Sequence, residues 1–424
     1  MMTTTEAKMT TDPKPDLTLR DAVIIGSGPA GSTVASLLAQ RGHDVVLLDR
    51  EEFPRHHVGE SLIPAVNSIL DRLGVVEWLQ ASSFLQKYSV QFVGASGQTS
   101  APFYFEDFDS LGLGYTWQVV RGTFDRMLVD RARELGAEIR SGTQAMAVDF
   151  HAGGTSTVWV KSSGDDPTMR KPIKARVIVD ASGQSGFLSS RLKLRSVDPR
   201  LKNGTIWTWY ENAHRDQGRD EGATIIFNSQ DHKSWFWYIP LPDNVVSVGC
   251  TGETDWLFGD GLTAEQIFER ELSRCPAIAM RLADARPVEA FRTTRDFSYS
   301  SSAVSGHGWV LVGDAYSFID PVYSSGVFLA LASGELAAES IHEGLLADDT
   351  SAEQLGNWKG SYDIGVENFR QLVYAFYDPT FNFADFIRWH PEQRDNLTDM
   401  LVGNVFKPGV GDLFETLTPM LSAH

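Results

Sequence analysis

Two short apolar runs near the N-terminus are separated by a segment with helical spacing. The runs are residues 22–25 and 45–48, and neither contains a polar residue. Between them, Ala30, Val34 and Leu37 recur at intervals of three or four, and Leu38 continues the apolar face. Unbroken apolar runs are typical of strands buried on both faces, and the intervening spacing is typical of an amphipathic helix. We therefore predict a strand–helix–strand unit within a parallel sheet.

Glycines follow the first of these predicted strands at a spacing that suits a dinucleotide. Gly28 allows the backbone to approach a pyrophosphate, Gly31 allows close helix–strand packing, and Asp49 ends the second strand where a ribose hydroxyl would lie. The unit predicts a Rossmann-like site for NAD or FAD, and the alternative is a glycine-rich crossover without a ligand. The candidate residues are Gly26, Gly28, Pro29, Ala30, Gly31 and Asp49.

Later segments return to this lobe. Residues 176–180 and 309–312 have the composition of buried strands, and Gly313 with Asp314 follows the second of them. Arg121 precedes an amphipathic helix, where its guanidinium would pair with a phosphate or flavin oxygen, or would form a surface salt bridge. The nucleotide-binding lobe is therefore predicted to be discontinuous in sequence.

A second predicted lobe lies between these segments. Short runs of β-favouring residues, separated by turn residues, predict an antiparallel sheet between residues 200 and 291. Strand alternation places Trp235 and Trp237 on one face, and Phe236 and Tyr238 on the other. The paired tryptophans would form ordinary core or one wall of a cavity for a flat ring.

A long helix rich in alanine and leucine is predicted from Val327 onward. Free N–H groups at Ser325 and Gly326 would lie at its start, which is a favourable position for an anion. The alternative is that Ser325 is a plain N-cap.

The expected domain organisation follows from these patterns. Residues 1–19 are predicted to be a disordered tail. The core spans residues 20–348, and residues 349–424 are predicted to form a C-terminal helical segment. Within the core, the nucleotide lobe takes about 20–90, 115–190 and 292–348, and the sheet lobe about 91–114 and 200–291.

Composition narrows the class of protein. The chain has 424 residues, a net charge of −18 and 42% hydrophobic residues, which predicts a globular protein that would be repelled by nucleic acid. Neither a membrane span nor a signal peptide is evident, so we expect a cytoplasmic protein. Cys250 and Cys275 lack metal-ligand spacing, which predicts reduced thiols and no metal site. A basic segment, residues 191–202, is interpreted as a solvated face or as a docking patch for an acidic partner.

Three motifs together resemble those of the flavin-dependent halogenases, which are relatives of the aromatic hydroxylases. Residues 235–240 read WFWYIP and match the family's WxWxIP signature. Residues 58–62 (VGESL) and 320–327 (DPVYSSGV) look like the branch that acts on phenols and pyrroles, including carrier-tethered substrates. The glycine turn and the Gly313–Asp314 pair are shared with the hydroxylases. The likeness extends from about Asp21 to Ile341.

The resemblance implies a fold, cofactors and roles for particular residues. The fold would be α/β, with an FAD-binding Rossmann-like lobe of the glutathione-reductase type, an antiparallel-sheet substrate lobe and a C-terminal helical segment. FAD, reduced by a separate flavin reductase, would use O2 to convert chloride to hypochlorous acid. Lys87 would be the catalytic lysine, acting as an ammonium or as an amine that forms a chloramine. The family pattern adds Arg121, Gly313, Asp314, Gly326 and Val327 to the FAD site, places chloride at Ser325 and Gly326, and makes a substrate barrier of Trp235, Trp237 and Tyr323.

One departure bears on the substrate. Tryptophan halogenases carry a glutamate where this chain has Tyr323, and that carboxylate would remove the ring proton. The resemblance therefore implies a phenol or pyrrole, free or tethered to an acyl or peptidyl carrier protein, in antibiotic or other secondary-metabolite biosynthesis. Three alternatives stay open at this point: an NADPH-dependent hydroxylase, a flavin-dependent prenyl reductase and a non-catalytic flavin sensor.

Overall fold

Parallel strands form the centre of the first lobe. The computed structural model describes residues 18–108, 114–295 and 298–421. At the end of β1, Ile25 lies opposite both Leu48 and Asp180, so the three strand ends meet at one edge. In sheet order the parallel strands are β20 (Trp309–Leu311), β10 (Lys171–Asp180), β1 (Leu19–Ile25), β2 (Val45–Leu48) and β7 (Glu138–Arg140). Antiparallel neighbours are β9 (Ser156–Ser162), β8 (Thr143–Phe150) and β19 (Ser305–Gly306).

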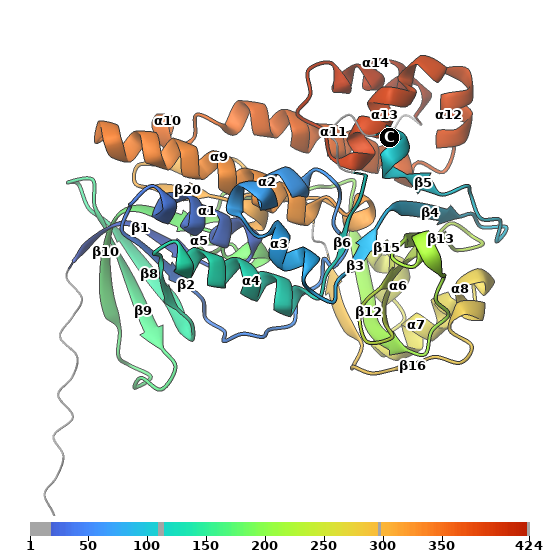
Figure 1. Cartoon of the computed structure of the whole chain (residues 1–424), viewed down its shortest axis with the longest axis horizontal. Coiled ribbons are helices and arrows are strands. Elements are labelled where there is room, and N and C mark those ends of the chain that lie inside the picture. Colours follow the sequence, from blue (N-terminus) through green and yellow to red (C-terminus); the bar gives the residue numbers. More distant parts are fainter. Residues whose placement is uncertain (1–17, 109–113, 296–297, 422–424) are drawn as a thin grey trace, which may run out of the picture.

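Helices cover this sheet (Figure 1). The first, α1 (Pro29–Gln40), is buried along almost its whole length and packs on α4 (Arg121–Glu134) and α9 (Gly326–Ala347). The approach to α9 is close, because a Cβ on Gly334 would lie 2.7 Å from the Ala30 carbonyl oxygen. The shorter helices of this lobe are α2 (Val66–Leu73), α3 (Val76–Gln80) and α5 (Phe187–Arg191).

The second lobe is a largely antiparallel sheet. Only the pairing of β13 with β4 is parallel among its described ladders. One face packs toward the first lobe, and the other carries α6 (Thr254–Phe258), α7 (Ala264–Leu272) and α8 (Pro276–Arg281). The strand order is β16 (Arg286–Pro287), β12 (Asn203–Glu211), β15 (Val245–Glu253), β14 (Ser234–Pro240), β13 (Thr224–Asn228), β4 (Ser89–Val93) and β5 (Phe103–Tyr104), with β17 (Arg292–Arg295) also on β12.

Two small sheets join the lobes. One pairs β3 (Leu85–Lys87) with β6 (Thr116–Gln118), and the other contains β11 (Arg195–Val197), β18 (Tyr299–Ser301) and β21 (Ser317–Phe318). The chain leaves β3 at Lys87 and enters the second sheet at Ser89. Lys87 therefore lies at the point where the chain passes from the small β3–β6 sheet to the sheet of the second lobe.

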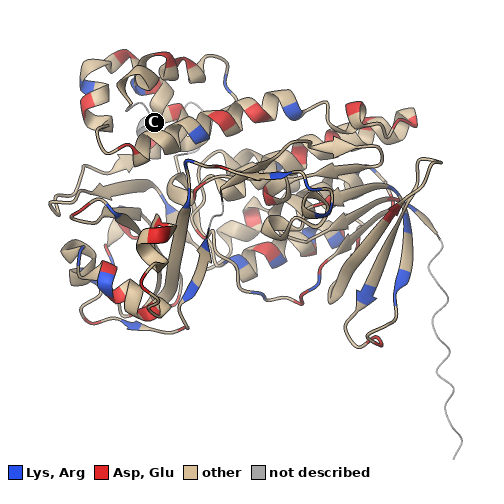
Figure 2. Cartoon of the chain, turned by 180° about the vertical axis from the view of Figure 1, so that it is seen from behind, with Lys and Arg blue, Asp and Glu red and all other residues tan. Residues whose placement is uncertain are grey.

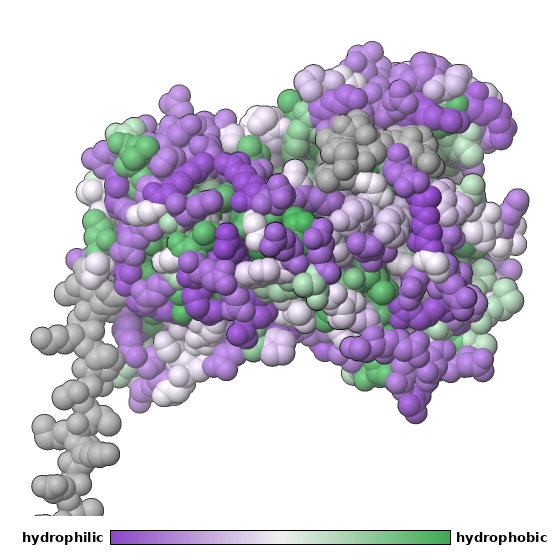
Figure 3. All heavy atoms as spheres, viewed as in Figure 1, coloured by the Kyte–Doolittle hydropathy of each residue, from purple (hydrophilic) through white to green (hydrophobic). Residues whose placement is uncertain are grey.

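The C-terminal segment is helical and lies above both lobes (Figure 1). It begins near α9 and ends over the second lobe. Its helices are α10 (Ala352–Leu355), α11 (Lys359–Tyr377), α12 (Phe383–Trp389), α13 (Arg394–Val402) and α14 (Leu413–Leu417). Charged residues of both signs are interspersed over the molecule (Figure 2), and polar residues cover most of the face in Figure 3, with apolar residues in separate patches.

The predicted fold class is confirmed, with two differences in detail. The strand expected at residues 176–180 is longer, because Lys171 to Ala175 pair with β9 and the parallel pairing with β1 already begins at Lys174. The strand-like stretch that ends at Val93 is two strands in different sheets. Most of the predicted tail, residues 1–17, lies outside the described residues. Cys250 and Cys275 are buried and free.

Candidate active site

The glycine turn leaves open space at one of its three glycines. A Cβ on Gly26, whose φ is +106°, would lie 2.3 Å from the Ala181 carbonyl oxygen. A Cβ on Gly31 would lie 1.9 Å from the Gly26 carbonyl oxygen. On Gly28 it would meet only Arg55 Nη2, at 3.7 Å. Gly26 and Gly31 therefore allow close packing, whereas Gly28 faces the space in front of the uncapped N-terminus of α1, where a phosphate is stabilised.

Asp49 ends β2 beside this turn. Its Oδ2 accepts hydrogen bonds from the backbone N–H of Ser27, at 3.0 Å, and from the Ser27 hydroxyl, and its Oδ1 accepts from Glu51 N at 2.9 Å. Arg55 Nε lies 3.8 Å from the same carboxylate, is buried and has no hydrogen-bond partner. Asp49 thus holds the turn in place, and Arg55 is a polar group at the turn that sequence reasoning did not identify.

Arg121 lies inside the protein and is not part of a surface salt bridge. Its Nε and Nη2 donate to the two oxygens of Asp125, at 2.8 and 3.1 Å, and Nη1 donates to the Val58 carbonyl at 2.7 Å. A Cβ on Gly59 would lie 2.8 Å from Arg121 Nη1 and 3.7 Å from Val327 Cγ2. The structure therefore brings Arg121 and the start of α9 to the same place.

Asp314 follows Gly313 in the turn after β20. Burial raises the pKa of Asp314 to about 7, while the charges of Arg121 and Arg195 lower it. Gly313 has a φ of +56° and donates its N–H to the Ser333 hydroxyl of α9 at 2.8 Å. These contacts fix the Gly313–Asp314 turn against α9.

Arg195 is a second candidate that sequence reasoning missed, because its basic neighbours placed it in a surface segment. Its guanidinium lies 3.8 Å from the centre of the Tyr299 ring, and its Nε and Nη2 are buried without hydrogen-bond partners. In the same segment, Arg191 stacks on Phe187. Arg200 stacks in the same way on Tyr374, so packing against the protein accounts for three of the five basic residues.

Lys87 is fully buried. Its Nζ donates to the Ser61 hydroxyl at 2.8 Å and to the Leu62 carbonyl at 2.9 Å, and lies 5.4 Å from the centre of the Phe105 ring. Burial lowers the pKa of Lys87 from 10.5 to about 7. Both hydrogen-bond acceptors are neutral, so near neutral pH a substantial fraction of this lysine is an uncharged amine.

The Ser61 hydroxyl continues a polar network from Lys87. It shares a hydrogen bond of 2.8 Å with Thr224 Oγ1, which accepts from Gln118 Nε2 at the same distance. Lys87 and Ser61 are 26 positions apart, and Ser61 and Thr224 are 163 apart. Ser61 belongs to the VGESL motif, but the spacing alone did not reveal its partner.

A cavity of about 30 Å³ adjoins Lys87. Its walls come from both lobes and from the C-terminal segment, and they include Tyr323 and Ser324 from the loop that precedes α9. The lining is mostly apolar. The lining residues are Ile63, Lys87, Val90, Phe92, Phe103, Phe105, Thr224, Ile226, Val322, Tyr323, Ser324 and Leu401.

The pre-α9 loop, residues 320–326, carries the predicted anion position. Ser324 adopts a left-handed conformation with φ of 56°, and Ser325 is the buried N-cap of α9 without a side-chain capping bond. Ser325 therefore occupies the N-cap position, as the alternative interpretation expects, but its hydroxyl makes no capping bond. The N–H groups at the start of α9 lie next to Ser324, which lines the lysine cavity.

The tryptophan pair lies on one face of β14, as strand alternation predicts. The ring centres of Trp235 and Trp237 are 6.1 Å apart, and both rings belong to the core between the lobes. Phe236 and Tyr238 pack on the opposite face. Neither tryptophan lines the small cavity at Lys87, whereas Tyr323, the third predicted barrier residue, does.

Glu60 connects the VGESL segment to this wall. Its Oε1 accepts from Trp209 Nε1 at 2.7 Å, its Oε2 has no partner, and burial raises its pKa to about 7. Trp237 Nε1 donates to the Ser247 hydroxyl at 3.2 Å, and Ser247 in turn lowers the pKa of Glu60.

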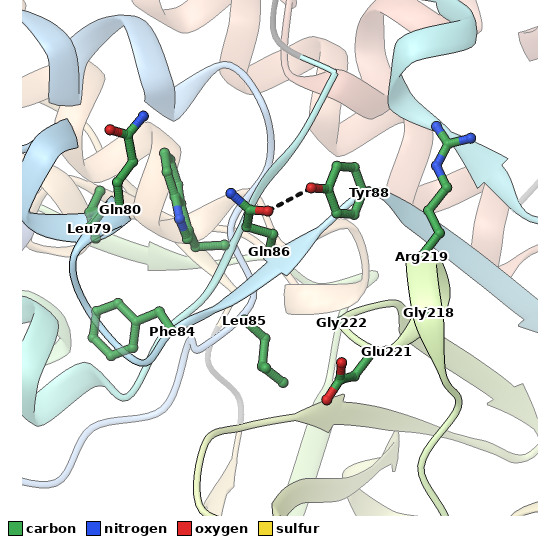
Figure 4. A pocket seen from close by; sticks show the side chains of 11 residues that line it. Leu79, Gln80, Phe84, Leu85, Gln86, Tyr88, Gly218, Arg219, Glu221 and Gly222 are labelled. Atoms are coloured by element: carbon green, nitrogen blue, oxygen red, sulfur yellow. Dashed lines mark hydrogen bonds between the residues drawn. The ribbon is translucent and has the colours of Figure 1, made fainter.

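A larger surface pocket, of about 740 Å³, lies on the other side of β3 (Figure 4). Leu85, Gln86 and Tyr88 line it, and the Tyr88 hydroxyl donates to Gln86 Oε1 at 2.6 Å. Lys87, between these residues, lines the inner cavity instead. The close approach of Gly222 to Gln86 forms part of the wall, because a Cβ there would lie 2.1 Å from the Gln86 carbonyl oxygen.

Among the residues that the structure describes, no helix has both the length and the apolar character that a membrane span requires. Within the same residues, no cluster of three or more histidine, cysteine, aspartate or glutamate side chains could hold a metal ion.

Comparisons with known proteins place the chain in a family. The FAD binding domain family matches residues 20–333. A 1H-pyrrole-2-carbonyl-(peptidyl-carrier protein) chlorinase of Pseudomonas fluorescens is 31% identical over 94% of this chain and 92% of that protein. The corresponding brominase of Pseudoalteromonas luteoviolacea is 30% identical over 91% and 92%. The structure of the flavin-dependent brominase Bmp2 superposes with a TM-score of 0.84 at 27% identity, covering 95% of this chain and 98% of that one.

The chain belongs to the flavin-dependent halogenases. It is therefore an FAD-binding oxidoreductase, and the relatives favour halogenation over the hydroxylase alternative. The residues present fit an FAD. Gly28 leaves a cradle in front of α1, and the guanidinium groups of Arg55 and Arg195 include buried nitrogens without hydrogen-bond partners.

Proposed function

We propose that this protein is an FADH2-dependent halogenase that makes hypochlorous acid from O2 and chloride. It chlorinates an electron-rich ring, a phenol, tyrosyl or pyrrole, in secondary-metabolite biosynthesis. A separate flavin reductase supplies the reduced cofactor. The observation that carries this proposal is the buried amine of Lys87, in a cavity that it shares with Tyr323 and Ser324 of the pre-α9 loop.

The first half of the reaction belongs to the nucleotide lobe. When bound as FADH2, the cofactor would supply two electrons and two protons, so that one O2, one chloride and one further proton give hypochlorous acid and water. Gly28, Arg55 and Arg121 hold the cofactor beside α1, with Asp314 on the α9 side. The N–H groups of Ser325 and Gly326 hold chloride at the start of α9.

The second half takes place at Lys87. The amine nitrogen has two N–H bonds committed to Ser61 and Leu62, which leaves its remaining position for the oxidant. We propose that the neutral amine takes chlorine from hypochlorous acid and releases water. The resulting N–Cl group transfers chlorine to ring carbon, and the displaced ring proton returns to the amine. Trp235, Trp237 and Tyr323 keep the ring away from FAD.

The lining of the cavity supports a neutral, self-activating ring. Among the described residues that line it there is no carboxylate, and Tyr323 stands where a proton-accepting glutamate would be needed for an indole. The cavity has room for a water-sized molecule but not for a ring. The aromatic substrate therefore requires lining side chains such as Phe103 and Phe105 to move aside.

The relatives support a tethered substrate. Both the chlorinase and the brominase named above act on a pyrrole carbonyl carried by a peptidyl carrier protein. We therefore propose a carrier protein as a partner. Their nearly equal identities to this chain do not discriminate chloride from bromide, and chloride is proposed as the physiological halide.

The experiment is an assay of the FAD-loaded enzyme with flavin reductase, O2 and chloride. Candidate substrates are pyrrolyl and tyrosyl groups on carrier proteins and the corresponding free acids. Mass spectrometry should show the chlorine isotope pattern on the ring. Hydroxylated product alone, or reduction of the bound flavin by NADPH without a reductase, would instead establish the hydroxylase alternative.

A further inference from the structure

The pre-α9 loop is tied to helix α11 through a buried carboxylate. Asp320 is fully buried, and its Oδ1 accepts from the N–H of Val322 at 3.1 Å. Its Oδ2 accepts from the Tyr377 hydroxyl at 2.8 Å and from Asn203 Nδ2 at 2.9 Å. A buried carboxylate needs these donors, because an oxygen left without a hydrogen bond costs the full desolvation free energy of that oxygen.

The Tyr377 hydroxyl has two partners, and the direction of each bond is fixed. It accepts from Trp235 Nε1 at 2.8 Å, since an indole N–H only donates. Its single proton is therefore free to go to Asp320. Tyr377 thus connects the tryptophan wall, which is Trp235 and Trp237 on β14, to the pre-α9 loop.

Ring packing reinforces the same connection. Phe376 meets Trp235 edge-on, with ring centres 6.0 Å apart, and meets Tyr323 in the same way at 6.1 Å. The Tyr323 hydroxyl in turn donates to the Leu372 carbonyl of α11 at 3.3 Å. The last turns of α11 therefore contact both the tryptophan wall and the pre-α9 loop.

We propose that Tyr377 is a positioning residue for the halide site. Its hydroxyl holds Asp320 and Trp235 in register, and this fixes the pre-α9 loop with its Ser325 and Gly326 amides. The proposal rests on the proposed function, since it assumes that these amides hold a halide. It also gives the C-terminal segment a role in the chemistry through the contacts of α11 with the pre-α9 loop.

The test compares two conservative variants on one helix. Tyr377→Phe removes both hydrogen bonds and keeps the ring, whereas Tyr374→Phe removes a hydroxyl whose partner, Asp198, lies outside the loop. Hydrogen exchange of the FAD-loaded enzyme should show faster exchange in residues 320–326 for Tyr377→Phe only. Bromide titrations followed by flavin absorbance should show about a tenfold higher Kd for that variant, as the loss of a charged hydrogen bond implies. Its flavin reoxidation should continue with less halogenated product per O2 consumed.

The outcomes separate this inference from the proposed function. Equal loop exchange and equal bromide Kd in the two variants would overturn the role of Tyr377. If the wild-type enzyme neither bound bromide nor halogenated any substrate, the assigned role at a halide site would fall with the proposed function. Faster loop exchange in Tyr377→Phe would then show that the hydrogen bond from Tyr377 to Asp320 does hold the loop, and that only the assignment of a halide to the loop had failed. Asp320→Asn changes the acceptor of the same hydrogen bond and should reproduce the faster exchange. This variant provides the test if Tyr377→Phe fails to fold.

Discussion

The glycine turn is one continuous segment, whereas the walls of the Lys87 cavity come from segments scattered between Ile63 and Leu401. In the turn, Gly31 is required by the Gly26 carbonyl oxygen five positions away, and Gly26 is required by Ala181, which directly follows the adjacent strand β10. In the cavity, the key contact joins residues that are 26 positions apart, and the next joins residues 163 apart. The glycine turn is therefore largely set by local sequence, while the position of the Lys87 amine depends on how the lobes pack.

A pair of alanine substitutions tests the different roles of Gly31 and Gly28 in the turn, and its effects are expected to be the largest. Gly31→Ala places a Cβ within 1.9 Å of the Gly26 carbonyl oxygen, and overpacking of this kind destabilises by about 1–3 kcal/mol or more. Gly28→Ala meets only Arg55, so the apoprotein should keep its stability while the Kd for FAD rises at least about tenfold. Thermal unfolding of the apoproteins and fluorescence titrations with FAD measure the two effects. Equal apoprotein stabilities would contradict the assignment of the two glycines.

This contrast also explains what the sequence could predict. The turn, Asp49 and the alternation of Trp235 and Trp237 follow from spacing within one or two elements, so the fold class could be predicted from the sequence. The role of Lys87 could be predicted only from the family resemblance, because nothing in the local sequence marks a lysine as buried. Ser61 and Tyr377 gave no signal of their partners, since their contacts arise from packing between segments far apart in the chain.

Arg195 shows a different limit. Its neighbours in sequence are basic and exposed, so composition assigned it to a surface segment, yet its guanidinium packs on Tyr299 near Asp314. Ser325 is a similar case, because the identity of an N-cap residue does not say whether its hydroxyl caps the helix.

The pH dependence of product formation tests the protonation state of Lys87 in the cavity. Burial lowers the pKa of Lys87 to about 7, so the neutral amine is lost as the pH falls through that value. If this amine carries chlorine, product formation should drop about tenfold for each pH unit below about 7 and level off above it. Flavin reoxidation, followed in parallel, should not show the same break. Glu60 titrates in the same range, so Glu60→Gln should retain the break. Activity that instead falls as the pH rises above 7 would favour the ammonium form.

A smaller effect is expected at Ser61. Ser61→Ala removes one of the two acceptors that orient the Lys87 amine, and the loss of about 1 kcal/mol should slow halogenation about fivefold. The Kd for FAD should not change. Ser68→Ala, on the exposed side of α2, is the matched control. Rates measured at saturating substrate would contradict the positioning of Lys87 by Ser61 if both variants matched the wild type.

The central claim is that the oxidant made at FAD reaches carbon only through the amine of Lys87. The most direct measurement is the amount of halogenated product per O2 consumed by Lys87→Met, with FAD, a flavin reductase, chloride and a substrate that the wild-type enzyme halogenates. We expect unchanged FAD binding, continued flavin reoxidation and a loss of product of at least about 100-fold. Halogenated product at the wild-type yield from Lys87→Met would contradict this requirement for the Lys87 amine.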